Sequence, residues 1–231
     1  MKKQNTSHAV MAKRFEENDS LDDFPTPPWA TRALFESTLK KYKSKLKKMK
    51  CLEPACNRGY MSRALKEYFK KVDSRDVWDY GFGKVENFLE TKYEKNSFDW
   101  VITNPPFNLA EEFLIKSLNI CSHGTAILAR TVFLESVGRY KNIFSKNPPT
   151  YFAQFTERVP MIKGRVDKQA STATGYAWFI WIKNSKINSK LTWIEPCRKL
   201  LEKNFDYEDF DKTINPKRKK KNILRSQYKL F

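Results

Sequence analysis

The sequence is poor in the residues that build metal sites, and it has no long hydrophobic run. Its 231 residues include four cysteines and two histidines, and the cysteines lack the paired spacing of a zinc site. We therefore expect no metal and reduced thiols. No apolar run approaches the ~20 residues of a membrane helix, and the basic start at residues 1–3 leads into polar residues rather than a signal-peptide core. This composition predicts a soluble cytoplasmic protein with no membrane partner.

Acidic residues are too few to balance the basic ones. Lys and Arg number 44 against 26 Asp and Glu, which gives a formal net charge of +18. Much of the excess lies in two clusters, Lys40–Lys50 and Lys217–Lys221. A lysine-rich face is usually only solvated, but a net charge this high attracts a phosphate backbone and releases its counterions. The charge therefore favours a nucleic acid as the partner.

Apolar segments alternate with segments of helical character along the middle of the chain. We expect strands at residues 51–53, 77–79, 100–103, 124–130, 151–159 and 176–182, with helices or turns at 29–46, 61–70, 85–91, 110–121 and 133–144. From residue 184 onward we expect a charged, patchily helical stretch. Alternation of this kind predicts an α/β fold with a mainly parallel sheet, helices on both faces, and ligands at the carboxyl ends of the strands.

The domain organisation follows from length and composition. At 231 residues and 40% hydrophobic content, the chain can bury one sizeable core but is short for two full domains. We expect a flexible polar arm at residues 1–23, a single domain at 24–200, and a basic carboxyl-terminal segment at 201–231 that is partly disordered when free.

One apolar segment runs directly into the tetrapeptide Asn104-Pro105-Pro106-Phe107. Because two prolines cannot continue a β-ladder, the strand ends at Asn104 and the turn after it is stiff. The side-chain carbonyl of Asn104 and the main-chain carbonyl of Pro105 can each accept one hydrogen of an amino group, while the Phe107 ring offers a face for stacking. The alternative interpretation is that the tetrapeptide is only a rigid loop without a binding role. The tetrapeptide suits a planar aromatic amine.

A second segment, residues 53–59, has the sequence Glu-Pro-Ala-Cys-Asn-Arg-Gly and predicts a tight turn between a strand and a helix. The two segments, in this order, resemble motifs I and IV of S-adenosylmethionine (SAM)-dependent amino-methyltransferases, in particular the small phage-type DNA adenine-N6 methyltransferases. Asn57 stands where that family usually has glycine. Asparagine tolerates positive φ, so the turn is expected to survive. The resemblance covers about residues 24–182 and implies a Rossmann-like methyltransferase fold.

Further segments fall where this family places them. Residues 24–27, Phe-Pro-Thr-Pro, resemble motif X at the methionine end of the cofactor site. Asp79 resembles the acidic residue that bonds the ribose hydroxyls, and Asn87-Phe88 resembles a segment that contacts the adenine ring of the cofactor. Taken singly, Asp79 is equally well a turn residue and Asn87 a helix cap. The resemblance implies a SAM site formed by Phe24, Thr26, Pro27, Glu53, Ala55, Asn57, Gly59, Asp79, Asn87 and Phe88.

Basic residues outside these motifs are candidates for nucleic-acid contacts. Arg165 and Lys168 lie in a polar stretch, residues 163–174, whose composition is typical of a mobile loop. The basic carboxyl-terminal segment adds Lys217, Arg218 and Lys219.

The resemblance implies that a methyl group is transferred from SAM to the exocyclic amine of adenine in DNA, with double-stranded DNA as the expected substrate. The base would be flipped out of the duplex and held by Asn104, Pro105, Pro106 and Phe107, so that position rather than a strong general base supplies most of the catalysis. The same four residues could instead hold one of three other methyl acceptors: the N4 amine of cytosine in DNA, adenine in RNA, or a glutamine side-chain amide. A further alternative is a catalytically inactive nucleic-acid-binding protein with this fold.

Overall fold

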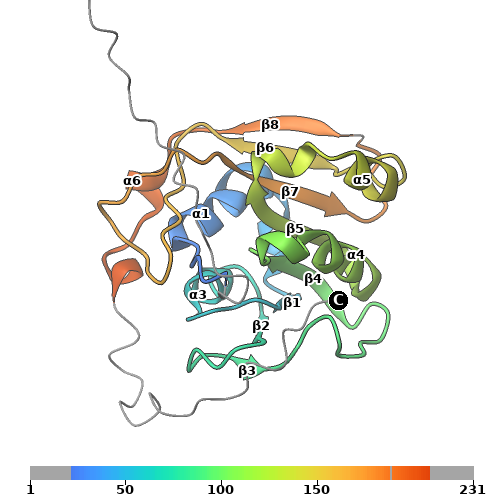
Figure 1. The fold of residues 1–231 in the computed structure, drawn as a ribbon, viewed down its shortest axis with the longest axis horizontal. Helices are drawn as coiled ribbons and strands as arrows, with labels where there is room; N and C mark the ends of the chain where they lie inside the picture. Colours follow the sequence, from blue (N-terminus) through green and yellow to red (C-terminus); the bar gives the residue numbers. More distant parts are fainter. Residues whose placement is uncertain (1–21, 188, 209–231) are drawn as a thin grey trace, which may run out of the picture.

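The computed structural model describes residues 22–187 and 189–208. In this part of the chain an eight-stranded sheet runs through the molecule in the order β3-β2-β1-β4-β5-β7-β6-β8 (Figure 1). Its strands are β1 Lys50–Glu53, β2 Lys71–Asp76, β3 Lys84–Val85, β4 Phe98–Thr103, β5 Cys121–Arg130, β6 Tyr151–Phe155, β7 Tyr176–Ile182 and β8 Lys190–Ile194.

Most neighbouring strands are parallel. β1 pairs with β2 and β4, β2 with β3, β4 with β5, and β6 with β8, all in parallel. β7 runs antiparallel to both β5 and β6. The structure therefore confirms the predicted α/β fold with a mainly parallel sheet.

Helical segments cover both faces of the sheet (Figure 1). Side chains of β4 alternate between the faces: Trp100 and Ile102 belong to the same buried cluster as Trp29, whereas Val101 packs in a cluster with Phe113. This alternation with both faces buried is what a parallel sheet inside an α/β fold requires. The helical segments are α1 Pro28–Ala33, η1 Leu34–Thr38, η2 Lys40–Tyr42, α2 Lys43–Leu46, α3 Tyr60–Leu65, η3 Phe107–Leu109, α4 Ala110–Ile120, η4 Thr131–Leu134, α5 Val137–Arg139, η5 Tyr140–Phe144, α6 Arg198–Leu201 and η6 Asn204–Tyr207.

The single helix predicted over residues 29–46 is interrupted. The backbone leaves the helical region at Leu39 (φ −97°, ψ 14°), and only short 3-10 and α-helical turns follow. Leu39 is fully buried, so packing fixes its position. The lysines after it repeat at i,i+4 spacing, as in Lys41 and Lys45, and like charges at this spacing destabilise a helix.

The strand predicted at residues 77–79 is wrong, because β2 ends at Asp76. The Asp76 carboxylate accepts a hydrogen bond from the Trp78 N–H at 3.0 Å, which turns the backbone out of the sheet. Val77 and Trp78, whose apolar character suggested a strand, are 37% and 39% exposed. The strand itself is polar, and its Arg75 pairs with Asp73 at 2.7 Å.

β8 was also missed, since residues beyond 184 were expected to be charged and patchily helical. It is an edge strand in the described part of the sheet, hydrogen-bonded only to β6. Leu191 and Trp193 on β8 are 50% and 62% exposed. β8 therefore lacks the continuous apolar sequence by which the buried central strands could be predicted.

Residues 198–207 pack against α1 through a buried ion pair. The Arg32 guanidinium lies 2.6 Å from a carboxylate oxygen of Asp206, with both side chains at most 3% exposed. It also donates to the Leu201 carbonyl at 2.7 Å and pairs with Glu67 at 2.8 Å. Because a buried charge must be paired, this contact fixes the carboxyl-terminal helices on the domain.

Several sequence predictions lie outside the described residues. These are most of the amino-terminal arm and the basic tail with Lys217, Arg218 and Lys219. The four cysteines are all described and all free. Within the described ranges, each helix is too short or too polar to span a bilayer.

Candidate active site at the carboxyl edge of the sheet

The parallel strands β1, β2, β4 and β5 end at one edge of the sheet, and the predicted motifs meet there. Glu53 ends β1, Asp76 ends β2, Asn104 directly follows β4, and Arg130 ends β5. The parallel registers of these strands bring their ends side by side. We refer to this region as the carboxyl edge. In folds of this class, ligands bind at such an edge.

The turn at residues 53–59, which resembles motif I, accommodates asparagine where that motif usually has glycine. Asn57 adopts a left-handed conformation (φ 50°), as does Gly59 (φ 81°). The Asn57 N–H donates to the Asp76 carboxylate at 2.8 Å, and the Asn57 side-chain oxygen accepts the Arg58 N–H at 2.7 Å. At Gly59 a Cβ atom would overlap the ring of Phe82. The sequence-based expectation that Asn57 would tolerate positive φ is confirmed.

Glu53, the acidic residue of motif I, is almost completely buried. Its side chain is 1% exposed, and the Ser62 hydroxyl donates to its carboxyl group. Ser62 is in turn 2.6 Å from the Ser74 hydroxyl on β2. Burial raises the pKa of Glu53 to about 8, so the carboxyl group holds a proton at neutral pH. The protonated form is both an acceptor and a donor of hydrogen bonds.

Asp76 is a candidate that the sequence analysis missed. It ends β2, is 7% exposed, and accepts backbone hydrogen bonds from Asn57 and Trp78. Burial raises its pKa to about 6, although these hydrogen bonds oppose the shift. The predicted ribose contact, Asp79, lies three positions further on in an exposed turn, where it accepts the Gly81 N–H at 2.9 Å. The sequence offered one signal for Asp76: it is the acidic residue that ends a polar stretch, directly before the apolar pair Val77 and Trp78.

The Asn104 side chain is oriented by the segment before α1. Its amide nitrogen donates to the Phe24 carbonyl at 3.0 Å. A carbonyl can only accept, so the nitrogen must face Phe24 and the amide oxygen points elsewhere. That oxygen is buried and has no hydrogen-bond partner among the described residues. An unsatisfied buried acceptor costs about 1–3 kcal/mol, so this oxygen would gain from a hydrogen-bond donor supplied by a ligand or a water molecule.

Residues 22–24 join motif I to motif IV. Asp23 accepts hydrogen bonds from the Asn57 side chain at 2.7 Å and from Arg58 at 2.8 Å. The Phe24 ring lies 5.4 Å from the Phe107 ring, centroid to centroid, at an angle of 34°. Phe24 and the following residues Pro25, Thr26 and Pro27 are buried. The structure therefore brings the three predicted segments, residues 24–27, 53–59 and 104–107, into one region.

Asn87 and Phe88 have structural roles in the free protein. The Asn87 side-chain oxygen accepts the Leu89 N–H at 3.0 Å. Phe88 is 1% exposed and packs against Phe113, with ring centroids 4.9 Å apart. Their contact with an adenine ring stays a prediction.

The polar stretch 163–174 approaches the carboxyl edge at its start. The Gly164 N–H donates to the main-chain carbonyl of Asp23 at 2.8 Å. Arg165 is 67% exposed and lies 3.3 Å from Asp167, and Lys168 is also exposed. Their contact with phosphate stays a prediction.

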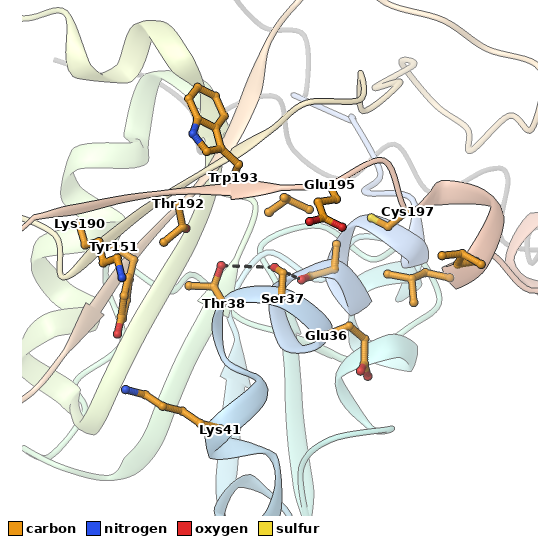
Figure 2. A pocket seen from close by; sticks show the side chains of 14 residues that line it. Glu36, Ser37, Thr38, Lys41, Tyr151, Lys190, Thr192, Trp193, Glu195 and Cys197 are labelled. Carbon is orange, nitrogen blue, oxygen red and sulfur yellow. Dashed lines mark hydrogen bonds between the residues drawn. The ribbon is translucent and has the colours of Figure 1, made fainter.

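A pocket of about 590 Å³ lies between η1 and β8. Lys41, Tyr151 and Lys190 lie toward one end and Glu195 and Cys197 toward the other, while Trp193 points away from it (Figure 2). None of the site residues predicted from the sequence lines this pocket.

The chain matches no protein-family model and no curated protein sequence. Its structure is similar to that of a type I restriction-modification methyltransferase subunit from Streptococcus thermophilus, with a TM-score of 0.57 and 12% identity over 74% of this chain and 47% of that one. It is also similar to a modification subunit assigned to a type I restriction enzyme from Vibrio vulnificus, with a TM-score of 0.51 and 13% identity over 73% of this chain and 49% of that one. The chain thus spans about half the length of these two proteins. It has the Rossmann-like fold of methyltransferases.

Proposed function

We propose that this protein is a SAM-dependent methyltransferase that acts on the exocyclic amine of adenine in double-stranded DNA. The observation that carries this proposal is the state of the Asn104 amide. Its nitrogen is committed to the Phe24 carbonyl, and its buried oxygen lacks a hydrogen-bond partner among the described residues. An amino group brought to this oxygen would satisfy it.

The groups at the carboxyl edge fit a cofactor that is rich in hydrogen-bond donors. The ribose hydroxyls and the amino group of SAM all donate hydrogen bonds, and the carboxyl groups of Glu53 and Asp76 can accept them. When bound, SAM would supply an electrophilic methyl group. We assign its binding to Phe24, Thr26, Pro27, Glu53, Ala55, Asn57, Gly59 and Asp76, with Asp79, Asn87 and Phe88 as further predicted contacts.

The residues of motif IV would act by position. The Asn104 oxygen and the Pro105 carbonyl accept the two hydrogens of the adenine amine, which aims the nitrogen lone pair away from the ring plane. Pro106 keeps the turn stiff, and the Phe107 ring stacks on the base. Because both acceptors are neutral, this arrangement holds the amine without removing a proton from it beforehand. Positioning of this kind supplies a large part of the catalysis in bimolecular transfers.

Charge and the resemblance of motif IV favour a nucleic-acid amine over the glutamine amide of a protein. The net charge of +18 favours a polyanion over a protein substrate. The aromatic residue of motif IV is phenylalanine, whereas the release-factor methyltransferases that this motif also resembles usually have tyrosine. The two structurally similar proteins, which bear restriction-modification names, are compatible with a DNA substrate.

The test is incubation of the purified protein with methyl-labelled SAM and, separately, mixed-sequence duplex DNA, single-stranded DNA and RNA. The nucleosides are then identified by mass spectrometry. We expect N6-methyladenine from duplex DNA. Labelled N4-methylcytosine, or label in RNA alone, would replace the proposed acceptor, and the absence of label from all three would contradict methyl transfer to nucleic acid.

A further inference from the structure

Arg130 is an exposed arginine that lies on the aromatic ring of motif IV. It ends β5, the strand next to β4, and its guanidinium carbon is 4.4 Å from the centroid of the Phe107 ring. Among the described residues the Arg130 side chain makes no hydrogen bond or ion pair. Its five N–H donors are therefore available to a ligand.

Arg139 shows what an arginine with a purely structural role looks like at the same end of the sheet. Its guanidinium lies 4.8 Å from the centroid of the Phe133 ring. Unlike Arg130, it also donates to the main-chain carbonyl of Phe133 at 2.7 Å, and to those of Val132 and Glu135 at longer distances. Its donors are used within the fold, whereas those of Arg130 are not.

A second exposed arginine, Arg158, lies close to Arg130 in the fold. Gly175 connects them: its carbonyl accepts the Thr131 N–H at 3.0 Å, and a Cβ atom on Gly175 would lie 3.3 Å from a guanidinium nitrogen of Arg158. Tyr176, the residue after Gly175, is the register partner of Arg130 in the antiparallel pairing of β7 with β5. The absence of a side chain at Gly175 therefore leaves room for the Arg158 guanidinium beside the end of β5.

We propose that Arg130 binds the DNA substrate. Its guanidinium covers the Phe107 ring in the free protein and is displaced from that ring by the flipped base. The guanidinium then binds the phosphate beside the flipped nucleotide, and Arg158 contributes to the same anion site. This inference rests on the proposed function, since it needs a base that stacks on Phe107. A planar guanidinium and a base cannot occupy one face of the ring together. An exposed cation–π contact is weaker than base stacking, so the exchange favours the base. A guanidinium offers two parallel donors to a phosphate.

The first test measures DNA binding as a function of salt, using a fluorescein-labelled mixed-sequence duplex of about 20 base pairs, a length near two helical turns. Replacement of one phosphate-binding arginine lowers the slope of log K against log salt by about 0.9. We expect this loss in Arg130→Ala and its recovery in Arg130→Lys, which keeps the charge. Lys70→Ala, at an exposed position before β2 and outside both lysine clusters, is the control and should match the wild type. Equal slopes in Arg130→Ala and the wild type would overturn the proposal.

The second test follows Arg130 itself by NMR. In the free protein, the Nε–Hε resonance that disappears in Arg130→Lys should be shifted by the ring current of Phe107. Saturating duplex DNA should return it to the ordinary arginine range. A resonance that keeps its ring-current shift in the complex would overturn the exchange.

Kinetics separate this inference from the proposed function. If the wild type methylates adenine, Arg130→Ala should raise KM for DNA about 10-fold, with kcat within about threefold, because Arg130 does not contact the reacting amine. Wild-type KM in this variant would refute the role of Arg130 and leave the methyltransferase proposal intact. If the wild type transfers no methyl group, the function fails, while the salt and NMR experiments still report on Arg130.

Discussion

The two edges of the sheet carry charged and polar groups in opposite ways. At the carboxyl edge the carboxyl groups of Glu53 and Asp76 and the unpaired oxygen of Asn104 are buried, and Arg130 is exposed beside them. At the amino edge, where β1, β2 and β8 begin, the charges are exposed lysines such as Lys50 and Lys190. The difference teaches that the net charge of +18 does not locate the site. The cluster Lys40–Lys50 leads into β1 at the edge away from Asn104.

The strongest test of this comparison is Asn104→Ala. Loss of one preorganised hydrogen-bonding group in an active site typically lowers kcat by about 10²–10³-fold. We expect at least this loss of methyl transfer, with SAM binding retained in calorimetry. Asn119→Ala is the matched control, because Asn119 is exposed near the end of α4, just before β5 begins at the amino edge. Near-normal turnover in Asn104→Ala would contradict the proposed role of Asn104 in holding the amine.

A second test separates the two aspartates near the end of β2. Asp76→Ala removes the acceptor of two part-buried backbone hydrogen bonds, so we expect the unfolding free energy to fall by about 0.5–1.5 kcal/mol for each bond lost. SAM affinity should fall more than 10-fold. Asp79→Ala, which removes an exposed carboxylate, should weaken SAM binding less. Calorimetric titration of both variants checks the order, and a larger effect at Asp79 would restore the ribose contact predicted from the sequence.

A third test uses pH. Burial raises the pKa of Glu53 from 4.5 to about 8, so the folded state holds the proton more tightly than the unfolded chain. The resulting stabilisation is complete below pH 4.5 and is lost as the pH rises toward 8. Urea unfolding should therefore show that Glu53→Gln weakens the decline in stability over this range. An unchanged decline would mean that Glu53 ionises normally.

Glu36, beside the lysine cluster, should respond with the opposite sign. Burial opposes ionisation there, but the hydrogen bonds from Lys43 and Tyr68 outweigh it and lower the pKa of Glu36. Stability from this group is present above the unfolded pKa and is lost as the pH falls. Glu36→Gln should therefore change the acid side of the same urea titration, by a small amount because the pair is half-exposed.

The smallest effect is expected at the amino edge. Replacement of exposed Lys45 and Lys48 by alanine should change the unfolding free energy by at most about 0.5 kcal/mol and leave KM for a short duplex within about twofold. Steady-state kinetics with a short duplex checks this. A loss as large as that of Arg130→Ala would place the DNA on the lysine cluster and break the comparison.

The sequence predicted the central strands and the motifs after them because both depend on local patterns. β7 is a continuous apolar run, and β4 contains the apolar run Trp100–Ile102. The ends of parallel strands share an edge, so Glu53 and Asn104 were expected to lie together. β2 has no apolar run, because its charged side chains such as Arg75 and Asp73 pair with one another in the fold. The sequence analysis therefore did not predict that this strand ends at Asp76.

Arg130 and β8 were missed for another reason. The position of Arg130 over Phe107 depends on a contact between two strands that are distant in sequence, and β8 forms only because β6 offers it an edge. Single-sequence patterns carry no information about such pairings. Neither feature has a local signature that a closer inspection of the chain would have found.

The departure at Asn57 adds a second contact between two regions that the Arg58–Asp23 ion pair already joins. A glycine would adopt the same left-handed turn more easily, but it has no side chain to reach Asp23, which Asn57 contacts at 2.7 Å. Through Asp23 and Phe24 the turn is connected to Asn104 on the neighbouring motif. The residue that departs from the family pattern therefore ties the turn at residues 53–59 to the segment that orients the Asn104 amide.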